Sequence, residues 1–151
     1  MPLSTLELMR RTREGGRGVT RRDYLDFVVD GRSLQDWFPR SEVTALGWSR
    51  VERTDIGRLL LHEAPELPTG RVALYICPEC GDIECGAVTA RITETTDSFV
   101  WSDFAWEGQV DYGAELDEDP LVQLYEGVGP FEFQKAAYQS ILNERLTQLK
   151  I

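Results

Sequence analysis

The alternation of apolar and polar residues predicts most of the secondary structure of this chain. In residues 24–31, YLDFVVDG, the side chains of Leu25, Phe27 and Val29 fall on one side of an extended chain, as in a strand packed on one face. Residues 71–76, RVALYI, are almost continuously apolar and suit a central strand. Further strands are expected over residues 58–64, 87–95 and 99–107. The short links between these ranges predict a mainly antiparallel sheet of four to five strands.

A periodicity of three to four residues predicts one long helix near the C-terminus. Within residues 131–149, the apolar side chains recur on one stripe: Phe133, Ala137, Tyr138, Ile141, Leu142, Leu146 and Leu149. Near the N-terminus, residues 3–13 suit a short helix, which the glycines of residues 14–18, EGGRG, interrupt. Ser33, with Asp36 three residues later, predicts another short helix through a variant of the capping box. The sequence thus predicts an α+β fold: an antiparallel sheet, short N-terminal helices and one long C-terminal helix.

Charge is distributed unevenly along the 151 residues, whose net charge is −10. Residues 1–22 hold six arginines and two glutamates, a balance of +4 that leaves −14 for the rest of the chain. We therefore divide the sequence into a basic N-terminal helix or arm, residues 1–22, and a single α+β domain, residues 23–151. The arm is expected to be mobile, to fold back on the acidic domain or to bind an acidic partner. The domain itself should repel nucleic acid and anionic membranes.

The sequence indicates neither export nor membrane insertion. No run of about 18 apolar residues is present, so no transmembrane helix is expected. Arg21 and Arg22 resemble the start of a twin-arginine signal, but acidic residues interrupt the segment that follows them. The three cysteines are an odd number, unlike the even sets of disulfide-bonded secreted domains. These features predict a cytoplasmic location.

All three cysteines lie within nine residues, as Cys77, Cys80 and Cys85 in CPECGDIEC. The first two have the C-x-x-C spacing of a zinc knuckle, in which the chain turns back so that two thiolates bind one metal ion. Gly81 supplies the backbone freedom that such a turn requires. Three interpretations are open: a zinc ion held by the three thiolates, three unreactive thiols in a shaped turn, and a redox pair.

A structural zinc ion needs four ligands, and the sequence does not identify the fourth. His62 is the single histidine. If the strands around His62 and before Cys77 formed a simple hairpin, the two residues would lie on the order of 16 Å apart, too far for a shared metal ion. Asp82, Glu84, a water molecule and a second subunit are the other candidates. A redox pair is the weakest interpretation, because strands are expected on both sides of the loop and no helix N-terminus would lower a thiol pKa.

Other enzymatic chemistry finds little support. No G-x-S-x-G motif accompanies the one histidine, and the sequence has neither a phosphate-binding loop nor a dinucleotide fingerprint. Asp103 and Glu107 could form a catalytic carboxylate pair, but a chain with 26 acidic residues offers many such pairs. The acidic run ELDEDP, residues 115–120, does not have the spacing of an EF-hand loop.

Aromatic residues gather around the strand expected at residues 99–107. The side chains of Trp101, Phe104, Trp106 and Tyr112 either pack in the core under the C-terminal helix or form an exposed recognition patch. The interaction surface expected on the second interpretation combines this strand with the acidic segment after it: Trp101, Asp103, Trp106, Asp111, Asp117 and Asp119.

Two segments, LYICPECGDIECGAVTARI (residues 74–92) and VWSDFAWE (residues 100–107), resemble an uncharacterised family of small bacterial proteins common in actinobacteria. Its members share a DGRSL turn, a cysteine loop of the form CPxCGDxxCGAVT, a WxDF strand and a C-terminal helix. The turn corresponds to residues 30–34 and the WxDF strand to residues 101–104. The resemblance covers most of the chain after residue 23 and implies no activity.

A non-enzymatic binding protein is the first functional hypothesis, for example an immunity-type or regulatory partner. A small acidic domain without an enzyme motif suits that role, because negative charge accelerates the capture of a basic partner protein. The second hypothesis is an enzyme that depends on zinc or on a thiol and is centred on the three cysteines. That enzyme would need an open coordination position or a reactive thiol, and a cleft beside the loop.

Overall fold

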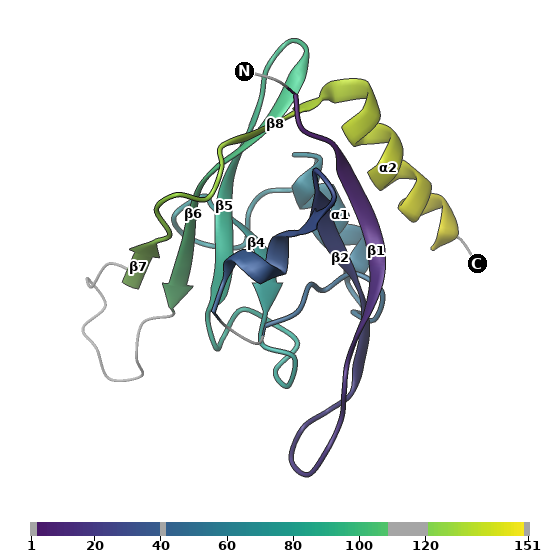
Figure 1. Cartoon of the computed structure of the whole chain (residues 1–151), viewed down its shortest axis with the longest axis vertical. Coiled ribbons are helices and arrows are strands. Elements are labelled where there is room, and N and C mark those ends of the chain that lie inside the picture. The colour runs from purple at the N-terminus through teal and green to yellow at the C-terminus, as the bar shows by residue number, and fades with distance from the viewer. Residues whose placement is uncertain (1–2, 40–41, 109–120, 150–151) are drawn as a thin grey trace.

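The computed structural model describes residues 3–39, 42–108 and 121–149 (Figure 1). Its elements are, in chain order, β1 (Leu6–Arg13), β2 (Arg22–Val29), β3 (Arg32–Ser33), η1 (Leu34–Trp37), α1 (Glu52–Leu59), β4 (Val72–Ile76), β5 (Ala87–Glu94), β6 (Ser98–Gly108), β7 (Leu121–Leu124), β8 (Phe131–Gln134) and α2 (Lys135–Gln148). The strands form two antiparallel sheets, one of three strands and one of five. The α+β class and the C-terminal helix are confirmed, whereas the prediction of a single sheet of four to five strands is wrong.

The three-stranded sheet contains the segment that the sequence predicts as an N-terminal helix. β1 pairs with β2 in an unbroken antiparallel register, from Leu6 opposite Val29 to Arg13 opposite Arg22. The prediction of a helix over residues 3–13 is therefore wrong. The sequence LELMRRTR favours a helix locally, but pairing with β2 satisfies its backbone and buries Leu6, and such tertiary contacts outweigh weak local propensity.

The predicted turn at Asp30 and Gly31 is confirmed, and it joins β2 to β3. Both residues have positive φ, 52° and 78°, as a two-residue hairpin turn requires. Asp30 also holds the start of the chain, because its carboxylate accepts hydrogen bonds from the Ser4 hydroxyl (2.8 Å) and the Thr5 amide (2.9 Å). The N-terminal residues described here thus belong to the folded body.

The five-stranded sheet is built around β6. One edge of β6 pairs with β5, and the other pairs with β8 at its start and with β7 at its end. β4 lies beyond β5, so the order along the sheet is β4-β5-β6-β7. The strands expected over residues 71–76, 87–95 and 99–107 are confirmed. Residues 87–90 are all buried, which shows that β5 is covered on both faces at its start.

α1 occupies part of the segment in which a strand over residues 58–64 was expected, and that prediction is wrong. Ile56, Leu59 and Leu60 are buried and recur at helical spacing. The apolar run RLLL suits either a strand or a helix, and packing on the core selects the helix. His62 lies beyond the end of α1 and is exposed.

The predicted short helix after Ser33 is a four-residue 3-10 helix, η1, and the described residues include no α-helix before α1. Ser33 does not cap it, because its hydroxyl donates to Asp26 instead. α2 begins four residues later than predicted, since Phe131–Gln134 pair with β6 as β8. The side chain of Gln134 accepts a hydrogen bond from the Ala137 amide (3.3 Å) and so caps α2.

The core lies where the two sheets, α1 and α2 meet. Trp101 is fully buried there, with its ring 5.3 Å from that of Phe27 and 5.2 Å from that of Phe133. Its indole nitrogen donates to the hydroxyl of Tyr138 (3.1 Å), which donates to the carbonyl of Leu59 (2.6 Å). None of the helices in the described ranges is long and apolar enough to cross a membrane.

Candidate functional site

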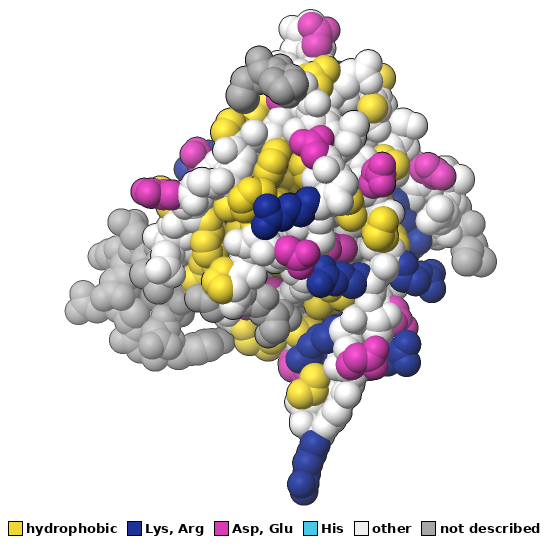
Figure 2. Space-filling view, viewed as in Figure 1, with side chains coloured by type: hydrophobic (Ala, Val, Ile, Leu, Met, Phe, Trp, Pro, Cys, Tyr) yellow, Lys and Arg dark blue, Asp and Glu magenta, His cyan; other side chains and the backbone are white. Residues whose placement is uncertain are grey.

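β1 and β2 form a long hairpin that extends away from the rest of the molecule (Figure 1). Residues 14–21, which we call the hairpin tip, are all exposed. Gly16 and Val19 exchange backbone hydrogen bonds of 2.9 and 3.1 Å and close the tip. Basic side chains lie along the projection, with acidic side chains between them, and a basic side chain lies at its end (Figure 2). The arginine-rich N-terminal segment described here is therefore part of a hairpin of two paired strands.

Residues 77–86, the cysteine loop, connect β4 to β5 beside this hairpin. The sulfur atoms of Cys77, Cys80 and Cys85 lie within 4.8 Å of one another. Cys80 and Cys85 are exposed and paired as a disulfide, whereas Cys77 is half-buried and free. The Gly81 amide donates to the Cys77 carbonyl (3.0 Å), so the chain turns back between the first two cysteines as the C-x-x-C spacing predicts.

The donor set of the reduced loop is compatible with a zinc ion. In a tetrahedral site with Zn–S bonds of about 2.3 Å, the sulfur atoms lie about 3.8 Å apart, close to the grouping found here. In the described part of the chain, no carboxylate or imidazole joins the three sulfurs within 4.8 Å. The exposed His62 is thus not a fourth ligand. The disulfide and the metal exclude each other, because zinc binds thiolates.

Glu79, between the first two cysteines, binds the cysteine loop to the hairpin. Its carboxylate accepts hydrogen bonds from the Thr20 hydroxyl (2.6 Å), the Thr20 amide (2.8 Å) and the Arg13 guanidinium (2.8 Å). These contacts, that of the Thr20 hydroxyl first, lower the pKa of Glu79 to about 2. The adjacent Pro78 carbonyl accepts a hydrogen bond from Arg22 Nε (2.9 Å). We call this set of contacts the outer anchor of the hairpin.

A hollow lies next to the outer anchor, and the exposed Cys80 is one of the residues that line it. The guanidinium carbon of Arg22 lies 4.1 Å from the ring centroid of Trp48, a cation–π contact. Trp48 and Arg22 line a hollow of about 380 Å³ together with Arg50 and Cys80. Two of the described residues lining it are arginines and none is acidic, in contrast to the net charge of the chain.

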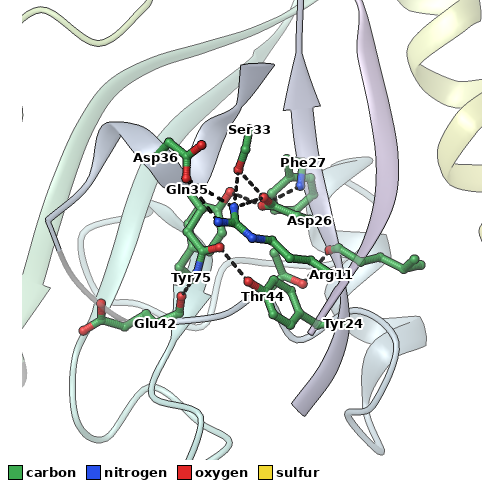
Figure 3. Close-up of polar contacts among 11 residues, drawn as sticks. Arg11, Tyr24, Asp26, Phe27, Ser33, Gln35, Asp36, Glu42, Thr44 and Tyr75 are labelled. Atoms are coloured by element: carbon green, nitrogen blue, oxygen red, sulfur yellow. Dashed lines mark hydrogen bonds and ion pairs between the residues drawn. The ribbon is translucent and has the colours of Figure 1, made fainter. Parts of the chain in front are cut away.

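A second carboxylate, that of Asp26 in the middle of β2, holds the hairpin to the rest of the molecule (Figure 3). The side chain of Asp26 is 2% exposed. Its Oδ1 accepts hydrogen bonds from the Tyr75 hydroxyl (2.6 Å) and the Phe27 amide (2.8 Å). Its Oδ2 accepts from the Ser33 hydroxyl and from Arg11 (3.3 Å). We call this set the inner anchor, because Tyr75 belongs to β4 of the other sheet.

Arg11 closes the inner anchor on its solvent side. Its guanidinium also donates to the Ser33 hydroxyl (2.8 Å) and to Asp36 (3.3 Å), which is more than half exposed. Burial, followed by the proximity of Asp26, raises the pKa of Tyr75 well above its usual value. The Tyr75 hydroxyl therefore stays protonated and keeps donating to Asp26 across the ordinary pH range. Every oxygen of the Asp26 carboxylate has a donor, so this network supports the fold and offers no reactive group.

Another acidic side chain, Asp55, lines a cavity of about 80 Å³ between α1 and the cysteine loop. Arg58 donates to its Oδ1 (2.9 Å), whereas its buried Oδ2 has no hydrogen-bond donor among the described residues. Burial raises the pKa of Asp55 to about 6; Arg58 opposes that shift, and the nearby Glu66 and Glu52 add to it.

The interaction residues predicted from the sequence are dispersed in the structure. Trp101 is completely buried in the core and presents no surface to a partner. Asp103 is exposed and lies 3.7 Å from Arg91, while Glu107 is buried and accepts a hydrogen bond from the Thr69 hydroxyl (2.8 Å). The remaining acidic candidates lie outside the described residues: Asp111, Asp117 and Asp119.

Trp106 is the half-buried member of the predicted set, and it packs on the cysteine loop. Its ring lies against Gly86, where a Cβ atom would overlap the indole and where φ is +94°. Gly86 therefore serves both as a turn residue and as a close-approach site. Trp106 supports the loop from the sheet side.

The sequence prediction missed the residues of both anchors. Asp26 had one detectable signal: it is an acidic residue within the otherwise apolar strand YLDFVV, and a charge in such a place is expected to be paired. Glu79 had none beyond its position between two cysteines, since its partners Arg13 and Thr20 are about sixty residues away in sequence.

Comparison of the chain with protein-family models, with curated proteins and with solved structures finds no match. The family resemblance drawn from the cysteine loop and the WxDF strand stays a prediction. The functional argument therefore rests on the chain's own geometry.

Proposed function

We propose that this protein is a non-enzymatic binding domain that uses the β1–β2 hairpin to recognise an acidic surface on a partner protein. The observation that carries the proposal is a hairpin whose exposed tip projects beyond the body and which two carboxylates, Glu79 and Asp26, hold to the body. A hairpin held in this way loses little conformational entropy on binding, which favours affinity.

The exposed side chains of the hairpin support an interface. Arg10, Arg17 and Arg21 are exposed, and so are the apolar side chains of Met9 (56% exposed) and Val19 (40% exposed). Arginine and methionine are enriched in protein interfaces, and their combination on one hairpin suits an acidic patch with an apolar centre. Capture of a basic partner through the acidic residues 111–119 stays a prediction.

The cysteine loop has a structural role in this proposal. In the reduced state, Cys77, Cys80 and Cys85 would hold one zinc ion, with a fourth ligand from outside the described cluster. The ion would fix the loop that carries Glu79 and Pro78, and thereby the outer anchor of the hairpin. Native mass spectrometry of reduced protein with added zinc, with a thiol count before and after chelation, tests this role. One ion per chain and thiols that react only after chelation are expected; thiols that react equally with and without zinc would refute it.

Charge reversal tests the hairpin as the recognition element. The variant Arg17→Glu/Arg21→Glu is compared with Arg53→Glu/Arg91→Glu, which changes the net charge equally at exposed positions away from the hairpin. We expect a cross-linked partner to be retained by the wild type and by the control but lost from the hairpin variant, with the cross-link mapping to an acidic surface. Equal retention by both variants, or equal loss, would contradict the proposal.

Among the described residues only three ligand atoms come together, and this favours a second candidate, an enzyme centred on a cysteine loop whose zinc ion would keep one exchangeable position. Catalytic zinc sites keep three protein ligands and one exchangeable position, and a hollow lies beside Cys80. For this candidate, a small anionic ligand such as thiocyanate should bind the cobalt-substituted protein and shift its visible absorption. An unchanged spectrum would exclude an open position and leave the structural role.

A further inference from the structure

The hollow beside Cys80 points to a covalent modification that the binding proposal does not require. We propose that the reduced Cys80 undergoes thiol–disulfide exchange with the disulfides of anionic low-molecular-weight thiols. The carboxylates of these disulfides would bind in the hollow. This inference concerns the metal-free loop and is independent of the hairpin's partner. It rests on three features: the lining of the hollow, the exposure of Cys80 and the proximity of two further sulfurs.

The residues that line the hollow favour a negatively charged ligand. Arg22 and Arg50 lie on its wall with Trp48 and Ser49, and no acidic side chain is among the described residues that line it. Arg50 is exposed, whereas Arg22 is fixed by Trp48 and by the Pro78 carbonyl. Guanidinium groups bind carboxylates through parallel hydrogen bonds, so a small thiol bearing carboxylates suits this wall.

The position of Cys80 makes it the thiol that reacts first. Cys80 is exposed and lines the hollow, Cys77 is half-buried, and Cys85 is exposed but does not line the hollow. A disulfide of a small anionic thiol would place its sulfur atoms next to Cys80 when its carboxylates contact Arg50.

The reaction proceeds in two balanced exchanges. The Cys80 thiolate attacks one sulfur of the small disulfide; a mixed disulfide forms at Cys80, and the other half leaves as a thiolate that takes a proton from water. The Cys85 thiolate then attacks Cys80 Sγ, which forms the Cys80–Cys85 disulfide present in the structure and releases the second small thiol. The protein dithiol is oxidised by two electrons and the small disulfide is reduced by two. Cys77, within 4.8 Å of both sulfurs, can attack either one, which forms a Cys77–Cys80 or Cys77–Cys85 disulfide and releases the other cysteine as a thiolate; the protein stays oxidised by two electrons.

The experiment uses full-length, reduced and chelated protein with two probes: glutathione disulfide, which carries carboxylates, and cystamine, a disulfide of similar chemistry without them. Intact-mass measurements follow the adduct. We expect the variant Cys77→Ser/Cys85→Ser to retain one glutathione at Cys80, and the wild type to form Cys80–Cys85 without a lasting adduct. The variant Cys77→Ser/Cys80→Ser, which keeps only Cys85, should react more slowly with glutathione disulfide.

The preference for the anionic probe tests the arginine wall. In the background that keeps only Cys80, Arg50→Gln should lower the rate ratio of glutathione disulfide to cystamine by roughly three- to tenfold. Arg53→Gln removes the same charge from an exposed position that does not line the hollow and should leave the ratio unchanged. An unchanged ratio in Arg50→Gln, or a Cys85-only variant that reacts as fast as the Cys80-only variant, would overturn the proposal.

Discussion

The inner and outer anchors hold the same hairpin through carboxylates with similar hydrogen-bond partners, yet they differ in their contact with solvent. Asp26 is 2% exposed and accepts hydrogen bonds from Tyr75, Phe27, Ser33 and Arg11. Glu79 is 42% exposed and accepts three, from Thr20 and Arg13. From the number and lengths of these hydrogen bonds alone, the two anchors would be expected to contribute almost equally to stability.

Their consequences differ because water can replace a lost partner at one anchor and not at the other. A buried donor without an acceptor costs its full desolvation, whereas an exposed donor finds water at once. The inner anchor should therefore determine whether the two sheets stay together, and the outer anchor should determine only how firmly the hairpin is held. This division suits a binding element whose root is stable and whose outer part is adjustable.

Removal of the inner carboxylate is expected to have the largest effect. Asp26→Ala leaves the buried Tyr75 hydroxyl and Phe27 amide without an acceptor, so the free energy of unfolding should fall by at least about 3 kcal/mol. Urea denaturation followed by tryptophan fluorescence measures it. Asp36→Ala removes the exposed partner of Arg11 and should cost less than about 0.5 kcal/mol. A loss below about 1 kcal/mol for Asp26→Ala would show that water reaches the inner anchor.

The next largest effect measures how much a single hydrogen bond of the inner anchor, that from Tyr75 to Asp26, contributes to stability. Tyr75→Phe keeps the ring that packs against Phe27 and Phe38 but removes the donor to Asp26, so it should cost about 1.5 to 2 kcal/mol. Tyr24→Phe is the matched control, because the Tyr24 hydroxyl donates to the neutral Gln35 side chain and its loss should cost about 1 kcal/mol. If both variants lose the same stability, the charge of Asp26 contributes nothing to its bond with Tyr75.

The strands that carry the inner anchor could be predicted from the sequence, but the anchor itself could not. β2 and β4 are evident from alternation and from a continuous apolar run, both of which are local signals. The bond between Asp26 and Tyr75 joins residues 49 positions apart, so it depends on how the two sheets meet. The buried charge in YLDFVV indicates that a partner exists without identifying it.

The outer anchor could also be predicted only in part from the sequence. The spacing of the cysteines predicts the turn and the proximity of the sulfurs, because only two residues separate Cys77 from Cys80 and four separate Cys80 from Cys85. The other half of the anchor is the β1–β2 hairpin, which the sequence does not predict. The leucines and arginines of LELMRRTR also suit a helix, so β1 is not recognisable as a strand. β1 becomes a strand only when β2 lies beside it, and a non-local pairing of this kind leaves a weak trace in the sequence.

A third carboxylate, that of Asp55, is largely buried like Asp26, but one of its oxygens has no donor among the described residues. Its pKa is about 6 in the folded protein against 3.8 for an ordinary aspartate. The folded state therefore binds the proton more tightly than the unfolded chain, and wild-type stability should fall as the pH rises from about 4 to about 6. Asp55→Asn does not titrate, so its stability relative to the wild type should increase by about 1 kcal/mol between pH 5 and pH 8.

Urea denaturation at the two pH values, with Asp36→Asn as an exposed control, measures this difference. The control should show no such gain, since Asp36 is more than half exposed. A relative stability of Asp55→Asn that is the same at both pH values would mean that the cavity is filled by a donor such as water. Asp55 would then resemble Asp26, because both oxygens of each carboxylate would have a hydrogen-bond donor.

The smallest expected effect on global stability belongs to the outer anchor, and it is therefore measured locally. Glu79→Ala removes the acceptor of the Thr20 amide, so hydrogen exchange at Thr20 and along the hairpin tip should accelerate while the free energy of unfolding stays close to that of the wild type. The anchor should persist above about pH 4.5 and weaken as the pH falls toward 2, because the folded-state pKa of Glu79 is lowered. Glu84→Ala changes another exposed acid of the cysteine loop and should leave exchange at Thr20 unaltered. If Glu79→Ala instead destabilised the protein as much as Asp26→Ala, the two anchors would be parts of one cooperative unit and burial would not be what distinguishes them.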